Sequence, residues 1–150
     1  MNYHTPSSFS DASTIAAKSA GQIRFLAGGT DVLVQMRSDI LTPDDLIDVK
    51  QIQGVKDIIQ NKDGSWTLGI AVTGAEMSEH SEFNKAWPGL VEAADLIGST
   101  QIQGRATIIG NLCNGSPAAD SVPAQIAAGA TVSIIGPTSE RIEAVENIPI

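Results

Sequence analysis

The sequence predicts an α+β domain of mixed α/β character on three observations. Short apolar runs typical of strands alternate along the whole chain with segments whose apolar residues recur at helical spacing. Glycine, proline, asparagine and aspartate gather at the junctions between these segments, as they do in turns. The chain has 150 residues, 42% of them hydrophobic, which is enough to bury a core.

The first predicted elements are a helix and a strand. Ser10 is expected to cap the helix, whose apolar residues over 12–20 recur at three- and four-residue spacing. Gly21 suits the left-handed conformation that often follows a helix end. The short apolar run 23–27 then predicts a strand that leads directly into Gly28-Gly29.

The middle of the chain predicts a further strand, a hairpin and a capped helix. Residues 46–49 have the composition of a strand, and the stretch 55–70 predicts a hairpin that turns at 61–64, where the residue types favour turns. Thr73 and Glu76 have the spacing of a capping box, in which each side chain accepts a hydrogen bond from the backbone amide of the other. A short helix is therefore expected to begin after Thr73.

The last third of the chain predicts two helices and a pair of strands. An apolar stripe over 90–97 indicates a helix with Pro88 near its start and Gly98 after its end. The remaining predicted elements are a helix over 121–128 and two strands, 131–135 and 141–145, joined by a turn at 136–139.

The charge of the chain argues against nucleic acids and membrane surfaces as partners. Asp and Glu number 17 while Lys and Arg number 9, and the formal net charge of -8 repels phosphate backbones and anionic lipids. No run of Lys or Arg offsets this repulsion. The segment 1–13 lacks the basic start and apolar stretch of a signal peptide, and no stretch suits a membrane span. A cytoplasmic protein is therefore expected.

The cysteine and histidine content predicts a domain without metal. Cys113 is the single cysteine, so it cannot form an internal disulfide or hold an iron–sulfur cluster alone, and His4 and His80 are too scattered for a metal site. Cys113 is expected to be a small buried residue and not a nucleophile, since no histidine lies near it in the sequence.

The segment 26–31 (Leu-Ala-Gly-Gly-Thr-Asp) is the first candidate binding site. It joins a predicted strand to a predicted helix, an order in which backbone amides and a helix start can bind a pyrophosphate. The amides of 28–31 and the Thr30 hydroxyl would donate hydrogen bonds to the pyrophosphate. Asp31 would instead cap the helix or bind a sugar hydroxyl. The segment matches neither the lysine-containing phosphate loop nor the G-x-G-x-x-G fingerprint, and Gly28-Gly29 alone is more often a tight turn.

The segment 107–120 is the second candidate binding site, and it is expected to be a loop. Small and hydrogen-bonding residues are dense in it although apolar residues flank it, which is unusual for plain surface. The side chains of Asn111, Asn114 and Ser116 can satisfy the backbone of a turn or bind a ligand. The sequence leaves these two roles equally open.

Together, the motif 27–31 and the motif 107–111 leading to 116–120 resemble the FAD subunit of molybdenum hydroxylases, the family of carbon monoxide and xanthine dehydrogenases. The resemblance covers nearly the whole chain. It implies a two-lobed FAD-binding fold of the vanillyl-alcohol-oxidase (PCMH) type, incomplete at the C-terminus. The small N-terminal lobe would span 1–53 and the larger mixed-sheet lobe 54–150, with FAD between them.

The resemblance also implies which residues contact FAD. The first motif would cradle the pyrophosphate, the second would pass alongside the cofactor, and Ile97 and Asp120 would add further contacts. Where the family usually has two glycines before the asparagine, this chain has Ile109 and Gly110, and a β-branched side chain resists left-handed dihedrals. The residues given FAD contacts in this way are Leu26, Ala27, Gly28, Gly29, Thr30, Asp31, Val32, Ile97, Thr107, Ile108, Ile109, Gly110, Asn111 and Asp120.

The function that the resemblance implies is electron transfer within an oxidoreductase complex. A large molybdopterin-binding subunit would hydroxylate the substrate, a small subunit would carry 2Fe-2S clusters, and FAD would pass electrons to NAD, quinone or oxygen. No catalytic acid–base pair is then needed, and the isolated chain is expected to be inactive. The alternative is a non-catalytic interaction module of the same fold that has lost FAD. A different nucleotide-binding enzyme is a third reading, disfavoured because both standard phosphate fingerprints are missing.

Overall fold

The computed structural model describes residues 1–148 and confirms the mixed class of helices and strands. The strands are β1 (Asn2–His4), β2 (Ile23–Leu26), β3 (Asp45–Asp48), β4 (Ile58–Gln60), β5 (Trp66–Leu68), β6 (Thr131–Ile135) and β7 (Glu140–Ala144). The helices are α1 (Phe9–Lys18), α2 (Val32–Arg37), α3 (Gly74–Glu79), α4 (Ser81–Ala86), α5 (Pro88–Asp95), α6 (Thr100–Gln103), α7 (Ile108–Cys113) and α8 (Ser121–Ala127). Two 3-10 helices complete the elements, η1 (Val49–Gln51) and η2 (Val145–Asn147).

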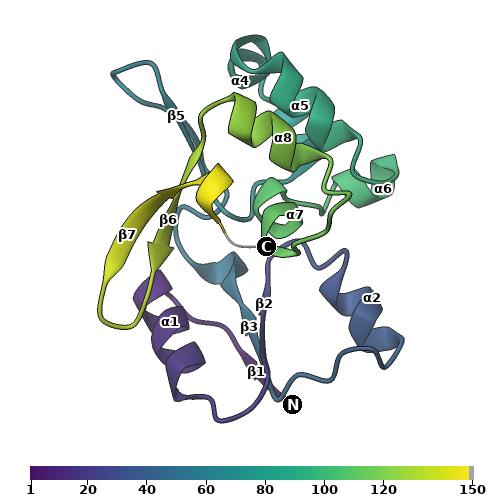
Figure 1. Cartoon of the computed structure of the whole chain (residues 1–150), viewed down its shortest axis with the longest axis vertical. Helices are drawn as coiled ribbons and strands as arrows, with labels where there is room; N and C mark the ends of the chain where they lie inside the picture. Colours follow the sequence, from purple (N-terminus) through teal and green to yellow (C-terminus); the bar gives the residue numbers. More distant parts are fainter. Residues whose placement is uncertain (149–150) are drawn as a thin grey trace.

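The N-terminal part of the molecule is a parallel three-stranded sheet, in the order β1-β3-β2, with α1 and α2 on either side (Figure 1). Ala12 of α1 packs on Ile47 of β3, which is fully buried. This core also takes in residues from beyond the sheet, and its buried members are Ala12, Ile47, Val49, Ile52, Val55 and Ala71.

The direction of the strands decides where a ligand can lie. Because β2 and β3 run parallel, with Leu26 beside Asp48, the segment after Leu26 and the segment after Asp48 leave the sheet at the same edge. Ligands of open parallel sheets bind beyond this carboxyl edge. The first glycine loop and Lys50 therefore start from neighbouring positions.

Strand β1 is an element that the sequence pattern did not predict, since it is three residues long and mostly exposed. Side-chain hydrogen bonds attach it to β3. Asn2 and His4 both reach Asp45 Oδ1, at 2.9 and 2.8 Å, and the Tyr3 hydroxyl donates to Asp48 Oδ2. Burial opposes the ionisation of Asp48, but hydrogen bonds from Lys50 and Tyr3 outweigh it and lower the pKa of this carboxyl.

This lowered pKa predicts that acid weakens the N-terminal sheet. A carboxyl whose pKa is lower in the folded than in the unfolded chain stabilises the fold above its unfolded pKa of about 3.9, and loses this contribution as the pH falls further. The free energy of unfolding, measured with urea between neutral pH and pH ~3, is expected to fall at the acid end. Asp48→Asn should reduce this dependence without abolishing it, because hydrogen bonds from Ser19, His4 and Asn2 also lower the pKa of Asp45 on the same strand. Asp57→Asn, at an exposed residue, should leave it unchanged. A wild-type slope in Asp48→Asn would contradict the assignment.

The C-terminal part gathers α3 to α8 around a second core, flanked by the hairpins β4–β5 and β6–β7 (Figure 1). Its buried members are Val72, Met77, Phe83, Leu90, Val91, Ala94 and Ile108. The two cores agree with a two-lobed domain, although Val55 and Ala71 join the first core from beyond residue 53. The division at 53/54 stays a prediction. Among the helices of residues 1–148, none has the length and apolar character to span a membrane.

Most of the predicted elements are confirmed. The hairpin 55–70 forms as β4 and β5, and the hydroxyl of Thr73 accepts from the Glu76 amide at 3.2 Å while the Thr73 amide donates to the Glu76 carboxylate at 2.8 Å. Pro88 is the first residue of α5, and Gly98 follows it with φ +69°. The strands near 131–135 and 141–145 pair as β6 and β7, and the helix near 121–128 is α8.

Three local predictions were wrong. Ser8, not Ser10, caps α1, because its Oγ accepts from the Asp11 amide at 3.1 Å and the helix begins at Phe9. The chain leaves α1 through extended backbone at Ser19, so Gly21 takes no left-handed conformation. The third error concerns residues 108–113, which form α7 where a loop was expected.

Candidate functional site

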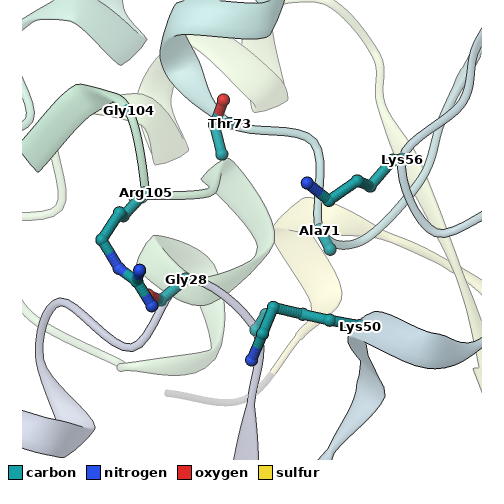
Figure 2. A pocket seen from close by; sticks show the side chains of 8 residues that line it. Gly28, Lys50, Lys56, Ala71, Thr73, Gly104 and Arg105 are labelled. Carbon is teal, nitrogen blue, oxygen red and sulfur yellow. The ribbon is translucent and has the colours of Figure 1, made fainter.

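A cavity of about 100 Å³ lies beyond the carboxyl edge of the parallel sheet (Figure 2). Segments distant in the sequence meet here, namely the first glycine loop, the residues after β3, the stretch between β5 and α3, and the residues before α7. The cavity is lined by Ala27, Gly28, Lys50, Lys56, Ala71, Thr73, Gly104 and Arg105.

Gly28 is the point at which the first loop touches the segment before α7. Arg105 Nε donates to the Gly28 carbonyl oxygen at 3.2 Å, and a Cβ atom at Gly28 would collide with the Arg105 carbonyl oxygen. The next residue, Gly29, has φ +79°, the left-handed region that favours glycine. The two glycines therefore have different roles, since Gly28 permits close approach and Gly29 permits the turn.

The backbone amides of residues 28–31 are available to a ligand. Within residues 1–148 they donate to no protein acceptor. Of the two roles expected of Asp31, the helix cap is not observed, because its carboxylate makes no capping hydrogen bond and instead accepts from Gln35 Nε2 at 3.1 Å. A bond from Asp31 to a sugar hydroxyl stays a prediction. Flanking residues fix the loop, with Leu26 buried at the end of β2 and Val32 beginning α2.

The segment between β5 and α3 connects this loop to the second motif. Thr73 and Thr107 form an isolated antiparallel bridge, and the Gly74 amide donates to the Ala106 carbonyl at 3.0 Å. Thr73, Ala106 and Thr107 are all buried. The start of the second motif is thus held next to Thr73, which lines the cavity.

The second motif forms a helix because its first residues satisfy the requirements of a helix start. Thr107 Oγ1 accepts from the Gly110 amide at 2.9 Å, and Ile108 and Leu112 bury the same face of α7 four residues apart. Ile109 lies in the first turn with a negative φ, which a β-branched residue adopts without strain. The expected conflict with left-handed dihedrals therefore does not arise.

Asn111 ties α7 to α8. Its Oδ1 accepts from the Ser121 amide at 3.2 Å and from the Ser121 hydroxyl at 2.7 Å. Ser121 Oγ in turn accepts from Gln125 Nε2 at 3.1 Å, and both Ser121 and Gln125 are buried. Of the two roles left open for Asn111, the satisfaction of backbone and neighbouring groups is the one observed for its oxygen. A contact with FAD stays a prediction.

Removal of this oxygen is expected to destabilise the fold. Asn111→Ala leaves the Ser121 amide without its partner next to a buried polar pair, and an unsatisfied buried group costs about 1 to 3 kcal/mol. Urea unfolding should show this loss for Asn111→Ala, whereas Asn114→Ala, at an exposed residue after α7, should change stability by no more than about 0.5 kcal/mol. Equal stabilities of the two variants would rule out the proposed network.

The remaining predicted site residues lie farther along the chain. Ile97 is half-buried in the turn after α5, and Asp120 is exposed at the start of α8 and makes no capping hydrogen bond. Ser116 Oγ accepts from the Ala118 amide at 3.2 Å, the turn-forming role that its residue type allows. Cys113 was expected to be buried but is exposed as the last residue of α7. Neighbouring atoms still desolvate its thiol and raise its pKa.

The positive charge at the cavity is the feature that sequence reasoning missed. Three of the nine Lys and Arg residues line it, from three separate segments: Lys50, Lys56 and Arg105. The absence of a basic run in the sequence therefore did not exclude a basic site in space. One signal was present, since Lys50 follows a predicted strand whose parallel neighbour leads into Gly28, whereas Lys56 and Arg105 had no local signal.

Two of the three cations are paired with carboxylates. Lys50 Nζ lies 2.7 Å from Asp48 Oδ1, and Lys56 Nζ lies 3.6 Å from Glu76 Oε1. Within the described part of the chain, Arg105 has no carboxylate oxygen within 4.0 Å. Free amides, a close backbone approach at Gly28 and a net positive side-chain charge are together suited to a phosphate-bearing ligand.

Comparisons with known proteins agree with this geometry. Residues 1–148 match the family described as the FAD binding domain in molybdopterin dehydrogenase. The xanthine dehydrogenase FAD-binding subunit of Escherichia coli O157:H7 is 33% identical over 93% of this chain and 48% of its own length. The carbon monoxide dehydrogenase medium chain of Afipia carboxidovorans is 32% identical over 96% of this chain and 50% of its own length. The chain thus spans about half the length of the curated relatives it matches.

Solved structures share the fold. Carbon monoxide dehydrogenase from Hydrogenophaga pseudoflava superposes with a TM-score of 0.89 at 27% identity, covering 97% of this chain and 50% of that chain. Quinoline 2-oxidoreductase from Pseudomonas putida 86 gives a TM-score of 0.88 at 21% identity, a likeness of fold alone. The fold expected from the two motifs is confirmed.

Proposed function

The chain belongs to the family of FAD-binding domains of molybdopterin dehydrogenases, and from this premise we propose that it holds the FAD of a molybdenum-hydroxylase-type oxidoreductase. The observation that carries the proposal is the meeting of the first glycine loop, the segment just before the second motif and three cationic side chains around one cavity. The residues that meet there include Ala27 and Gly28, to which the resemblance assigns contacts with FAD.

The residues present suit the diphosphate of FAD. The amides of 28–31 offer fixed donors, and the cavity wall carries more positive than negative side-chain charge. Donors that are fixed before binding lose little entropy when the anion arrives. In this proposal the second motif, with Ile97 and Asp120, lies along the rest of the cofactor, a role that rests on the resemblance.

The chemistry is supplied by the flavin, which accepts and releases electrons one or two at a time. The residues of this chain bind the cofactor, orient it and limit its contact with water. No general acid or base is required for that task. The chain is therefore expected to act as an electron-transfer unit and to have no turnover of its own.

We place this unit in a cytoplasmic complex with a molybdopterin-binding large subunit and a small subunit that carries 2Fe-2S clusters. Relatives of the chain are named as FAD-binding subunits or medium chains of dehydrogenases, which supports a multi-subunit assembly. Electrons would reach FAD from the clusters and leave to NAD, quinone or oxygen. The single cysteine suits a reducing compartment.

The alternative, a module of this fold that has lost FAD, is not favoured. Its main support was the Ile109 departure from the family motif, and Ile109 lies in a helix turn that accommodates it. The glycines that the first loop needs are both present. A different nucleotide-binding enzyme is less favoured still, because neither phosphate fingerprint occurs in the sequence.

Titration with FAD, followed by the quenching of flavin fluorescence, tests the proposal. We expect the chain to bind one FAD in preference to ATP and NAD, and more tightly when it is assembled with the two proposed partner subunits. The complex should then reduce an acceptor at the expense of substrate. Preference for ATP or NAD, or the lack of FAD in both the chain and the complex, would refute the proposal.

A further inference from the structure

Arg105 occupies a position that the assigned FAD contacts do not include. It precedes Thr107 by two residues, and its Nε–H donates to the Gly28 carbonyl across 77 positions of sequence. Figure 2 shows its guanidinium extended against Gly28 at the edge of the cavity. The Arg105 backbone carbonyl also lies against Gly28, so one residue contacts the first loop twice.

The charges around the cavity give Arg105 a second property. The three cations Lys50, Lys56 and Arg105 have two carboxylate partners, Asp48 and Glu76, which leaves one uncompensated positive charge. Arg105 is the cation without a carboxylate within 4.0 Å in residues 1–148. Because Nε faces Gly28, the terminal guanidinium nitrogens keep donors for another acceptor.

We propose that Arg105 is a positioning residue that locks the first glycine loop to the start of the second motif and supplies the charge that selects a diphosphate-bearing ligand. The proposal rests on the proposed FAD function and deepens it. Lys50 and Lys56 contribute less to the selection of the ligand, since their carboxylate partners offset their positive charges. Arginine suits both tasks because its planar fork can donate to a carbonyl and to a phosphate at once.

The test combines three variants with four probes. Arg105→Met removes the charge and the donor, Arg105→Lys keeps the charge but not the fork, and Arg141→Met removes an arginine paired with Glu143 on the exposed hairpin. The probes are FAD, ADP, inorganic pyrophosphate and riboflavin, the last of which has no phosphate. Amide hydrogen exchange of Leu33 and Gln35, which donate to the carbonyls of Gly29 and Asp31, reports on the loop without any ligand.

Arg105→Met is expected to lower the affinity for FAD, ADP and pyrophosphate about tenfold or more, and to leave the affinity for riboflavin unchanged. Its FAD affinity should depend less on salt, because a screened charge has been removed. Exchange of the Leu33 and Gln35 amides should become faster. Arg105→Lys should restore part of the affinity and salt dependence but not the slow exchange, and Arg141→Met should match the wild type throughout.

If Arg105→Met kept both the wild-type affinity for FAD and the wild-type hydrogen exchange of the Leu33 and Gln35 amides, the inference would be overturned. An equal loss of affinity for riboflavin and for FAD would also overturn it, since Arg105 would then not select the ligand through its diphosphate. If the wild-type chain bound no FAD, the proposed function would fail by itself, while the exchange measurement would still decide whether Arg105 holds the loop. Should Arg105→Met fold poorly, the same comparisons between Arg105→Lys and wild type decide the outcome.

Discussion

Gly28→Ala is expected to reduce the affinity for FAD by about tenfold or more, the largest effect of any single methyl group at the site. An added Cβ would collide with the Arg105 carbonyl oxygen, which is backbone and cannot rotate away. The loop and the second motif must therefore move apart, and the hydrogen bond from Arg105 Nε to Gly28 is lost. Flavin fluorescence titration of wild type and variant measures the change.

Gly29→Ala provides the comparison for this prediction. Its Cβ would meet the ends of the Leu26 and Leu33 side chains at 2.8 and 2.9 Å, and these flexible groups can yield. The remaining cost is the left-handed backbone at φ +79°, about 1 to 2 kcal/mol for a residue other than glycine. We expect Gly29→Ala to bind FAD more tightly than Gly28→Ala. The reverse order would mean that the turn, not the contact with Arg105, governs the site.

Gly69→Ala is expected to destabilise the whole domain by about 1 to 3 kcal/mol or more, as overpacking does in other interiors. Gly69 donates to the Asp57 carbonyl at 2.9 Å, and an added Cβ would collide with the backbone of Val55. Val55 and Ala71 belong to the N-terminal core, and Lys56 lines the cavity. The variant should therefore lose stability in urea and also bind FAD less tightly.

Gly89→Ala is the matched control. Gly89 lies in the first turn of α5 and does not have a positive φ. Apart from its chain neighbours and the backbone of its own helix, no atom of residues 1–148 lies within 4 Å of its would-be Cβ. Alanine in a helix is more favourable than glycine by up to about 1 kcal/mol, so this variant should be as stable as wild type or more so. A similar loss of stability in both variants would show that the crowding at Gly69 is not the cause.

Sequence patterns located the elements whose causes are local. The capping box at Thr73, the turn at 61–64 and the proline at the start of α5 depend on neighbours a few residues away. Two short motifs were enough to identify the family. The class of fold and the position of the first glycine loop could therefore be predicted from the sequence.

The features that were missed depend on distant partners. Strand β1 exists because Asp45 and Asp48 hold its side chains, and those residues lie more than 40 positions away. Asn111 and Gly110 are poor helix formers, yet α7 forms because Ile108 and Leu112 bury its inner face. The basic character of the cavity likewise arises only when β3, the segment before β4 and the segment before α7 are brought together.

The order of strands in the N-terminal sheet has a consequence for how the molecule assembles. The central strand β3 comes last in the sequence, so β1 and β2 cannot acquire a hydrogen-bonded neighbour in the sheet until residues 45–48 are in place. The glycine loop must then wait for Arg105, which lies 77 positions after Gly28 in the sequence. Such long closures slow folding. The binding site should be one of the last features to form, and the Leu33 and Gln35 amides, which donate to carbonyls of the glycine loop, should gain protection from hydrogen exchange after those of α1 during refolding.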